Sequence, residues 1–476
     1  MTKTYVLDTN VLIQAPYAVN CFEDNQVILP MVVLEELDNL KKAEGERGAN
    51  ARAAIRMLEQ LRQKGDLLKG VKLKTGGCLR VEKNFVDVKL PPDLPEEKAD
   101  NRILKVCRGL AGRAETGGSG AAEETGRSGA RGVTEEIILV TKDILLRIKA
   151  QIIGIRAEDF TTEQVSDRDE QYTGRLEVYI PEENMKDFKK KGIPLDAAYI
   201  TDDQGVRSYP QLWENQFLIL KADQSAKKTV LGRVQEDRIV PLDYKKSKPY
   251  GISPRNSGQY FLQEALMQPA DKAPLVIVKG MAGTAKTFYS LAVGLEKLLN
   301  NPTGEYRRII VSRPNAQFDG DIGFLPGDEQ EKISPLMRPV IDNLEQLIDS
   351  NEEKRYEDET ELKGKVDEIF DRGLIQTEAL NFIRGRSIVK TYLVIDEAQN
   401  MTPNQVKGII TRAGKGTKVI LLGDPNQIDR PFLDERTNGL SYASEHMKGS
   451  SLCWQITLSA GECERSLLAM DAVKRL

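Results

Sequence analysis

The sequence predicts an α/β protein with three parts: an N-terminal α/β domain, a small β-rich module, and a C-terminal domain with a parallel sheet and a phosphate-binding loop. Near both ends of the chain, apolar runs end in acidic or small residues and are followed by amphipathic helices. Between them, short apolar runs alternate with polar turns. The predicted boundaries are 1–160, 161–248 and 249–476.

The composition limits the classes of protein to consider. The 476 residues suffice for two or three domains, and 68 basic against 72 acidic residues give a net charge of −4. This charge neither requires nor excludes nucleic acid, which would need local basic patches. Five scattered cysteines give no disulfide framework, and a single histidine, His446, argues against a zinc site. Without a signal peptide or an apolar run of about 18 residues, we expect a cytoplasmic protein with no membrane partner.

Two predicted strands near the N-terminus lead to acidic residues. Tyr5–Leu7 delivers Asp8 at its C-terminal end, and strand 27–29 leads into a helix that carries Glu35 and Glu36. Open α/β folds build their sites at the carboxyl ends of strands. Asp8 and one of the two glutamates are therefore candidate site residues.

Two further acids follow the same pattern. Asp100 begins a helical stretch, and the apolar strand 137–140 ends just before Asp143. With Asp8 and Glu36 they form a set of four carboxylates, which as hard oxygen donors suit Mg²⁺ or Mn²⁺. Two such ions could activate a water and stabilise the leaving 3′-oxygen of a phosphodiester. Each acid alone also has a structural interpretation, and Asp100 is equally suited to cap its helix.

Four stretches resemble the successive motifs of a PIN domain over roughly residues 1–160: VLDTNVLI, VVLEELDNLKK, ADNRILKVC and ILVTKDILLRIKA. The resemblance implies a metal-dependent single-strand ribonuclease fold, with Asn10 and Thr141 in supporting positions. Glu36 matches better than Glu35 because the family's acid directly precedes a leucine. The catalytic, metal-binding acids implied by the resemblance are Asp8, Glu36, Asp100 and Asp143.

One segment departs from a compact PIN domain. Residues 112–132 are rich in Gly, Ser, Ala and Glu without periodicity, so we expect a flexible loop. Arg113, Arg127 and Arg131 could contact RNA, but a solvated linker is the favoured interpretation.

The middle of the chain, 155–248, contains short apolar runs such as RLEVYI and QFLIL, broken by polar turns. They predict a small β module or a β-rich linker, with KKSKP at 245–249 as its exit hinge. An OB-like nucleic-acid module is an alternative, in which five aromatic side chains would supply stacking faces; the same side chains could equally form the core of a small sheet. These are Tyr172, Tyr179, Tyr199, Tyr209 and Trp213.

The stretch GMAGTAKT follows an apolar strand at 275–278 and precedes a helical pattern at 288–299. Small residues in such a loop let consecutive N–H groups converge on a β-phosphate, and the helix N-terminus adds its positive dipole end. Lys286 would reach the β/γ-phosphates of ATP, and Thr287 would ligate Mg²⁺. The predicted nucleotide-binding residues of the loop are Gly280, Gly283, Thr284, Ala285, Lys286 and Thr287.

Ala285 stands where the usual pattern of this loop has glycine. A methyl group is tolerable at this position if φ is negative. We therefore expect a modest departure that keeps ATP binding and leaves the ATPase rate open.

Two later strands end in residues suited to ATP hydrolysis. Strand 392–395 leads to Asp396, which would hold Mg²⁺ through water, and to Glu397, which would polarise the attacking water. Strand 419–422 leads to Gln427, which is placed to sense the γ-phosphate.

Three residues outside these strands complete the predicted nucleotide site. Gln259, close to Asn256 at a helix start, could read the edge of adenine, although a plain helix start also explains both residues. Arg412 and Arg465 are candidate arginine fingers and could equally be surface arginines.

A further set of motifs is similar to the PhoH family over roughly 250–476: GMAGTAKT, VSRP, GFLPGDEQEKISPLMRPVIDNL, FIRGRS, VIDEAQN, TRAGKGTKVILLGDPNQID and ERSLLA. The ATPase core of that family is similar to the first motor domain of superfamily one helicases, so the resemblance implies a RecA-like P-loop NTPase. No second motor domain follows before Leu476. We therefore expect a homo-oligomeric ring, with a hexamer as a candidate size, in which Arg412 or Arg465 acts across the interface.

Together the two resemblances imply an ATP-dependent RNA remodeller and endoribonuclease. Its cofactors would be ATP and Mg²⁺ (or Mn²⁺), and its partner would be single-stranded RNA or a tailed RNA duplex. Two alternatives stay open: an ATP-switched RNA-binding regulatory protein without robust nuclease activity, and a toxin-type ribonuclease restrained by its own ATPase or by a partner.

Overall fold

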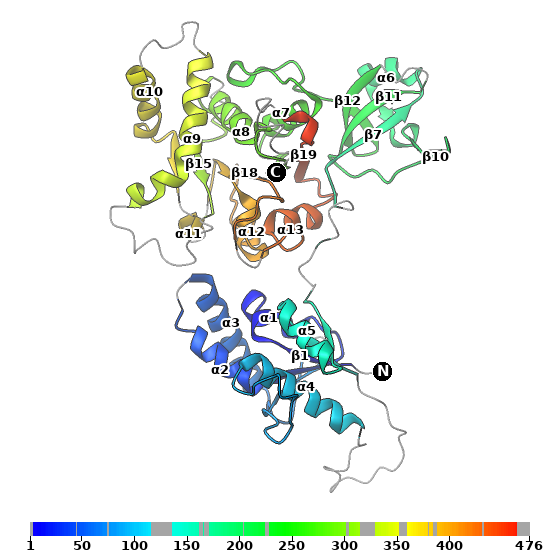
Figure 1. Ribbon diagram of the computed structural model, residues 1–476. Helices are drawn as coiled ribbons and strands as arrows, with labels where there is room; N and C mark the ends of the chain where they lie inside the picture. The colour runs from blue at the N-terminus through cyan, green and yellow to red at the C-terminus, as the bar shows by residue number, and fades with distance from the viewer. Residues whose placement is uncertain are drawn as a thin grey trace. The chain divides into compact units, whose positions relative to one another are not determined.

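The computed structural model forms two compact units (Figure 1). The first spans Met1–Thr162, and the second contains Glu163–Gln317 and Leu325–Leu476. Arg127, Arg131 and Arg465 lie outside the described residues. The structure describes residues 3–43, 45–73, 76–115, 136–160, 165, 171–202, 204–223, 228–300, 304–314, 329–351, 359–378, 380–383, 388–430 and 433–463.

A six-stranded sheet forms the centre of the first unit, in the order β3-β4-β2-β1-β5-β6. Neighbouring strands are parallel except for the β3–β4 pair at one edge. β1 lies between β2 and β5, so the residue that follows it, Asp8, lies at the middle of the sheet's carboxyl edge. The strands are β1 (Lys3–Leu7), β2 (Gln26–Pro30), β3 (Val71–Lys72), β4 (Cys78–Glu82), β5 (Glu136–Val140) and β6 (Arg156–Glu158).

The helices of the first unit pack their apolar faces against this sheet. In α2, Val33 and Leu37 are buried, Glu36 is half-buried and Glu35 is exposed, as the helical period requires. Glu36 therefore lies on the side of α2 that is turned toward the rest of the first unit. The described helices are α1 (Thr9–Gln14), α2 (Met31–Leu40), α3 (Gly45–Arg62), α4 (Ala99–Glu115) and α5 (Ile144–Ile152), with a 3₁₀ turn at Ala18–Asn20.

The main sheet of the second unit is entirely parallel, in the order β16-β15-β17-β18-β14-β19. Its inner strands are apolar runs buried on both faces, as a parallel sheet covered by helices requires. The carboxyl ends of all six strands lie along one edge. The strands are β14 (Leu275–Lys279), β15 (Arg308–Ser312), β16 (Ile375–Thr377), β17 (Thr391–Ile395), β18 (Lys418–Gly423) and β19 (Cys453–Thr457).

Helices flank this sheet, and α12 and α13 pack against each other (Figure 1). α8 starts directly after the phosphate-binding loop and packs against α7. The described α-helices are α7 (Ser257–Met267), α8 (Lys286–Leu295), α9 (Glu329–Asn351), α10 (Glu359–Asp371), α11 (Leu380–Ile383), α12 (Pro403–Ile410) and α13 (Gly439–His446). Short turns of 3₁₀ or π helix lie at Pro249–Gly251, Glu296–Asn300, Ala398–Asn400 and Ala460–Glu462.

A second, five-stranded sheet forms a β-rich module within the second unit, in the order β7-β11-β12-β13-β8. β7 and β11 are parallel, and the other pairs are antiparallel. Phe188 of α6 (Asn184–Lys191) packs over Gly232, where a Cβ would lie 2.8 Å from the phenyl ring. The strands are β7 (Arg175–Ile180), β8 (Ile193–Pro194), β11 (Phe217–Ala222), β12 (Thr229–Gln235) and β13 (Arg238–Pro241); Leu195–Ala197 forms a 3₁₀ turn, and β9 (Ile200–Thr201) and β10 (Arg207–Ser208) form a separate hairpin.

Four of the five aromatic residues singled out in the middle region are packed. Tyr172 and Tyr199 are buried, and Tyr179 stacks on Tyr199 with ring centroids 6.0 Å apart. Trp213 is half-buried beneath the Lys448 ammonium, whereas Tyr209 is 66% exposed. The hydrophobic core of the β-rich sheet contains none of these side chains, and Tyr172 and Trp213 pack beside Lys448, just after α13, so four of them are covered without forming the core of the small sheet.

The β-rich module is joined to the main sheet of its unit. Thr457 at the end of β19 donates its backbone N–H to the Thr173 carbonyl at 2.8 Å. Phe217 of β11 stacks on Phe261 of α7, with ring centroids 4.7 Å apart. The run 245–249 is held as well, because the Gln263 side chain of α7 donates to the Tyr244 and Ser247 carbonyls.

The predicted α/β class with a parallel C-terminal sheet is confirmed. Across the described ranges, none of the helices has the length and apolar character needed to cross a membrane.

Candidate active sites

The first candidate site lies at the carboxyl edge of the first unit's sheet. Asp8 follows β1, and Thr141 follows the neighbouring β5, so parallel pairing brings the two side chains together. Thr141 Oγ1 donates to Asp8 Oδ2 at 2.6 Å, and the Thr9 N–H donates to Asp8 Oδ1 at 2.6 Å. Asn10 Nδ2 in turn donates to Thr141 Oγ1 at 3.2 Å. Asp8, Asn10 and Thr141 therefore form one bonded cluster.

Burial raises the pKa of Asp8 to about 6. Hydrogen bonds from Thr141 and Thr9 act in the opposite direction, while the charges of Glu36 and Asp100 add to the rise. Asp8 thus lies near enough to Glu36 and Asp100 to be repelled by both carboxylates. The site carries an excess of negative charge that a divalent cation would relieve.

The two glutamates of α2 have different surroundings. Glu36 Oε2 accepts a hydrogen bond from Thr9 Oγ1, next to Asp8. Glu35 Oε2 instead pairs with Arg102 Nη1 at 3.0 Å, on the exposed side of α2. This geometry supports Glu36 as the site residue.

The remaining two acids have structural partners. Asp100, in the first turn of α4, pairs with Lys149 Nζ of α5 at 3.0 Å. Asp143 is the N-cap of α5 and accepts hydrogen bonds from the Leu145 and Leu146 amides. Its own N–H donates to Thr141 Oγ1 at 3.0 Å, which ties it to the Asp8 cluster.

The residues of this edge fit a hard divalent cation by donor type, because all are carboxylate, hydroxyl or amide oxygens. Among the residues that the structure describes, no three acidic, histidine or cysteine side chains are grouped tightly enough to hold one ion as they stand. Asp100 and Asp143 are committed to Lys149 and to the α5 amides, so ion binding would have to compete with these contacts.

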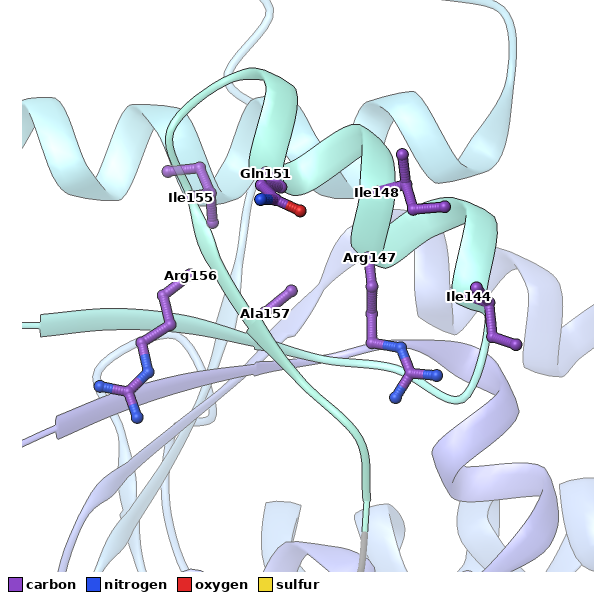
Figure 2. Close-up of a pocket in the computed structure, with 7 residues that line it drawn as sticks. All are labelled: Ile144, Arg147, Ile148, Gln151, Ile155, Arg156 and Ala157. Atoms are coloured by element: carbon purple, nitrogen blue, oxygen red, sulfur yellow. The ribbon is translucent and has the colours of Figure 1, made fainter.

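A shallow pocket of about 330 Å³ opens beside α5 (Figure 2). Both of its guanidinium groups are paired: Arg147 with Asp159 at 3.4 Å, and Arg156 with Glu136 at 2.6 Å. It contains none of the predicted site residues. It is lined by Ile144, Arg147, Ile148, Gln151, Ile155, Arg156 and Ala157.

The second candidate site lies at the carboxyl edge of the main sheet, where β14 ends in the loop GMAGTAKT. Lys286 Nζ donates to the Gly280 and Met281 carbonyls, at 2.5 and 2.9 Å. The Thr284 hydroxyl also donates to Met281, at 2.7 Å. Gly280 is required by space, because a Cβ there would lie 2.9 Å from Leu458. The loop is thus ordered by its own side chains.

Ala285 adopts the left-handed conformation, with φ 60° and ψ 24°. The expectation of a tolerated methyl depended on a negative φ and is wrong. At a positive φ the Cβ crowds the following carbonyl, which costs a non-glycine residue roughly 1–2 kcal/mol. The alanine is therefore strained at the point where α8 begins.

Thr287 and Asp396, the two predicted magnesium ligands of this site, lie within hydrogen-bonding distance of each other. The Thr287 hydroxyl donates to Asp396 Oδ1 at 3.1 Å across the gap between α8 and the end of β17. Burial raises the pKa of Asp396, although the nearby Arg313 opposes the rise. A hydroxyl and a buried carboxylate at the end of a phosphate-binding loop form a donor pair that fits a nucleotide-bound Mg²⁺.

Glu397 is held from two sides. Arg313, which follows β15, donates from Nη2 to Glu397 Oε1 at 2.9 Å and lies 3.5 Å from Asp396 Oδ2 through Nε. Gln399 Nε2 donates to Glu397 Oε2 at 2.6 Å. Glu397 itself has a left-handed backbone, with φ 56°.

Gln399 also joins β17 to the turn after β18. Its Nε2 donates to the Gln427 carbonyl at 2.7 Å, and its Oε1 accepts from the Asp424 N–H at 3.1 Å. Gly423 makes this approach possible, because a Cβ there would lie 2.3 Å from Gln399 Oε1. The side chain of Gln427 is exposed at the end of this network.

Of the predicted nucleotide-site residues outside the loop and the strand ends, Gln259 and Arg412 lie among the described residues. Gln259 is buried in the first turn of α7, where its Oε1 accepts from the Arg255 N–H at 2.9 Å and its N–H donates to Asn256. Arg412 is exposed and donates to the Gly408 carbonyl. Arg465 lies outside the described residues.

Known families match both parts of the chain. A model described as PIN domain matches residues 5–161, and one described as PhoH-like protein matches 251–476. Protein PhoH2 of Bacillus subtilis is 40% identical over 480 aligned residues, which cover 100% of both chains. Those of Mycolicibacterium smegmatis and Thermobispora bispora are 31% and 30% identical, each over 97% of this chain and 94% of the relative. The chain belongs to the PhoH family.

The PhoH domain thus contains the phosphate-binding loop and the Asp396–Glu397 turn, and the PIN domain contains the carboxylate cluster. This combination indicates an ATPase joined to a nuclease-type domain. Two of the residues in the PhoH site, Arg313 and Gln399, were not predicted. Their motifs, VSRP and DEAQ, were visible in the sequence, but nothing in the sequence shows that both side chains reach Glu397.

Proposed function

We propose that the chain is an ATP-driven RNA remodeller whose PIN domain cuts the single-stranded RNA that its PhoH domain exposes. The proposal combines two separate sets of chemical groups in one protein. The observation that most supports the proposal is the hydrogen bond between Thr287 and Asp396. A P-loop ATPase uses such a hydroxyl and carboxylate around the metal ion of its nucleotide.

In the PhoH domain, the loop amides and Lys286 would bind the phosphates of ATP. Lys286 would exchange its present carbonyl partners for phosphate oxygens. A magnesium ion held near Thr287 and Asp396 would supply charge neutralisation. Glu397 would orient the attacking water, and its two donors, Arg313 and Gln399, would fix the carboxylate for this task.

In the PIN domain, Asp8 and Glu36 would form the core of the metal-binding set, with Asp100 and Asp143 completing it. Thr141 and Thr9 orient Asp8 and Glu36 by direct hydrogen bonds. Bound metal would supply the activated water and the stabilisation of the leaving oxygen. The substrate would be single-stranded RNA, as membership of the PIN domain implies.

A homo-oligomeric ring is part of the proposal. In such a ring a neighbouring copy would supply an arginine, such as Arg412 or Arg465, to the nucleotide site.

The proposal is tested with a tailed RNA duplex, with and without ATP, in Mg²⁺ or Mn²⁺. We expect Asp8→Asn to abolish cleavage while keeping ATP turnover, and Lys286→Ala to abolish turnover and the ATP-dependent part of cleavage. Wild-type protein that cuts no RNA, with Asp8→Asn identical to it, would refute the nuclease half. Intact turnover in Lys286→Ala would refute the motor half.

An ATP-switched RNA-binding regulator is the second candidate, and the strained Ala285 favours it. A strained backbone at this point of the loop would slow hydrolysis without preventing ATP binding. Slow turnover together with an ATP-dependent change in RNA affinity, and no cleavage, would support this candidate over the first.

A further inference from the structure

The carboxylate of Glu462 is buried between three parts of the second unit. It accepts hydrogen bonds from the Ser459 N–H, the Ser257 hydroxyl and the Gly258 N–H, at 2.8, 2.9 and 2.8 Å. Ser257 and Gly258 form the first turn of α7, so the anion also meets the positive end of that helix. Gly258 permits the approach, because a Cβ there would lie 2.6 Å from Glu462 Oε2.

The fourth partner of Glu462 comes from the β-rich module. Arg175 at the start of β7 reaches both carboxylate oxygens through Nη1, at 2.7 and 3.0 Å. The two side chains are only 18% and 9% exposed, so the pair is shielded from solvent. Burial alone would raise the pKa of Glu462, but the Ser459 amide and the Arg175 guanidinium outweigh it and lower that pKa.

The segment that contains Glu462, residues 458–463, contacts the phosphate-binding loop. The Leu458 N–H donates to the Lys279 carbonyl at 2.8 Å, immediately before the loop. The Leu458 side chain faces Gly280, and Cys463 Sγ lies 3.5 Å from the Ala282 carbonyl. Residues 458–463 therefore contact the loop at its start and at its middle.

The β-rich module contacts α7 at a second point. Glu264 of α7, whose side chain is fully buried, accepts from the Asp243 and Tyr244 amides and lies 3.6 Å from the Arg233 guanidinium of β12. Two arginines of one module thus reach two buried carboxylates, one on α7 and one at its N-terminus. A connecting linker would not need these contacts.

We propose that Arg175 is a positioning residue of the nucleotide site. By holding Glu462 on the first turn of α7, it fixes segment 458–463 against the phosphate-binding loop. The β-rich module is then a functional part of the ATPase, not a spacer between two enzymes. The inference rests on the proposed ATP binding by the PhoH domain.

The test uses the full-length protein and a fluorescent ATP analogue. We expect Arg175→Ala to raise both the Kd of the analogue and the KM for ATP roughly tenfold, as the loss of one buried charged hydrogen bond implies, and to change kcat less. Arg175→Lys, which keeps the charge with fewer donors, should restore part of the affinity. Arg207→Ala is the matched control in the same module, because that guanidinium side chain is 56% exposed.

A purely structural role would give a different result. It would lower the melting temperature and the active fraction in Arg175→Ala, and leave the Kd and KM of the folded protein unchanged; that outcome overturns the proposal. If Arg175→Ala does not fold, Glu462→Gln carries the test, because it keeps the shape and removes the charge. Wild-type affinity in Glu462→Gln would then overturn the proposal. Absence of nucleotide binding by the wild-type protein would instead refute the proposed ATPase.

Discussion

Two non-glycine residues of the PhoH site have left-handed backbones. Ala285 precedes the loop lysine with φ 60°, and Glu397 follows Asp396 with φ 56°. Such conformations cost of order 1–3 kcal/mol and persist where the surrounding structure enforces them. Lys286 and Thr287 follow Ala285 directly, so the strain lies where the phosphates would bind.

We expect Ala285→Gly to stabilise the second unit by about 1 kcal/mol, because glycine adopts a positive φ without the steric penalty. Chemical denaturation followed by circular dichroism measures the change. Ala292→Gly, in the buried middle of α8, is the control and should destabilise the unit by about 1 kcal/mol or more. Equal destabilisation by both substitutions would mean that the alanine is not strained.

Asp8 makes the stability of the PIN domain depend on pH. The pKa of Asp8 is about 6 in the folded chain, above its unfolded value. The protonated carboxyl therefore contributes fully to the free energy of unfolding below about pH 4, and this contribution is lost as the pH rises through 6. The ionised carboxylate then costs about 3 kcal/mol in the absence of metal.

Asp8→Asn removes this cost. In EDTA at pH 7 we expect the variant to unfold at a higher denaturant concentration than the wild type, with a gain of about 1–2 kcal/mol after the altered bond to Thr141 is included. At pH 4 the gain should vanish. Asp93→Asn, at an exposed position of the same unit, should show no such trend. A gain that is independent of pH would contradict the assignment.

At this scale the sequence located the acids but not their surroundings. Asp8, Asp396 and Glu397 were proposed from the ends of predicted strands, and Glu36 was preferred to Glu35 from the resemblance to a PIN domain. The sign of φ at Ala285 could not be predicted, because it is set by the closure of the whole loop. The role of Arg313 was hidden for a similar reason, since its partners lie on another strand.

Among the elements of the PhoH domain, β17 and β18 pair along their backbones, and the Gln399 side chain also bridges the turns that follow them. Gln399 is fully buried and bonds at once to Glu397, to the Asp424 amide and to the Gln427 carbonyl. A shift of the Gln427 backbone would therefore move the side chain that holds the Glu397 carboxylate.

We expect Gln399→Ala to lower kcat for ATP hydrolysis about 10- to 100-fold, with the Kd for ATP within about threefold of wild type. Truncation leaves buried amide and carbonyl groups unpaired, at about 1–3 kcal/mol each, and releases Glu397. Steady-state turnover and nucleotide titration separate the two effects. Gln376→Ala, on the edge strand β16, is the control; a kcat equal to that of the control would exclude this role.

The elements were largely predictable from periodicity. The strands before Asp8, Asp143, Asp396 and the phosphate-binding loop were expected within one or two residues of their observed ends. Continuous apolar runs identify buried parallel strands with little ambiguity when a glycine or an acid ends them. The order of strands in each sheet could not be obtained in this way, because it depends on contacts between distant segments.

On the scale of the whole molecule, the PIN domain and the second unit are separate bodies, whereas the β-rich module and the PhoH domain share one. Phe217 of the module is fully buried against Phe261 and Trp454, which are themselves almost inaccessible to solvent. Removing the module would expose these rings and leave Glu264 and Glu462 without their arginines.

We expect a chain of residues 163–476 to fold and to bind ATP, and a chain of residues 249–476 to aggregate or unfold. Exposure of large apolar rings and the uncovering of buried charges both disfavour the shorter chain. Size-exclusion chromatography and thermal unfolding of the two chains measure the difference. A stable, ATP-binding 249–476 chain would show that the module is dispensable.

The contacts between the β-rich module and the PhoH domain could not be predicted from the sequence. Arg175, Arg233, Glu264 and Glu462 look like ordinary surface charges in the sequence, and only the fold pairs them across up to 287 positions. Composition and spacing identify domains well, but the interfaces between domains depend on such remote pairs.

The position of β19 has a consequence for translation. The PIN sheet is complete once β6 has been made, at Glu158, whereas β14 acquires its neighbour β19 only at Thr457. A ribosome that adds about 5–20 residues per second needs roughly 15–60 s for this interval. During this interval the nascent chain would contain a complete PIN domain and an incomplete PhoH domain. If the proposed nuclease activity is present, it would arise next to the mRNA that is being translated.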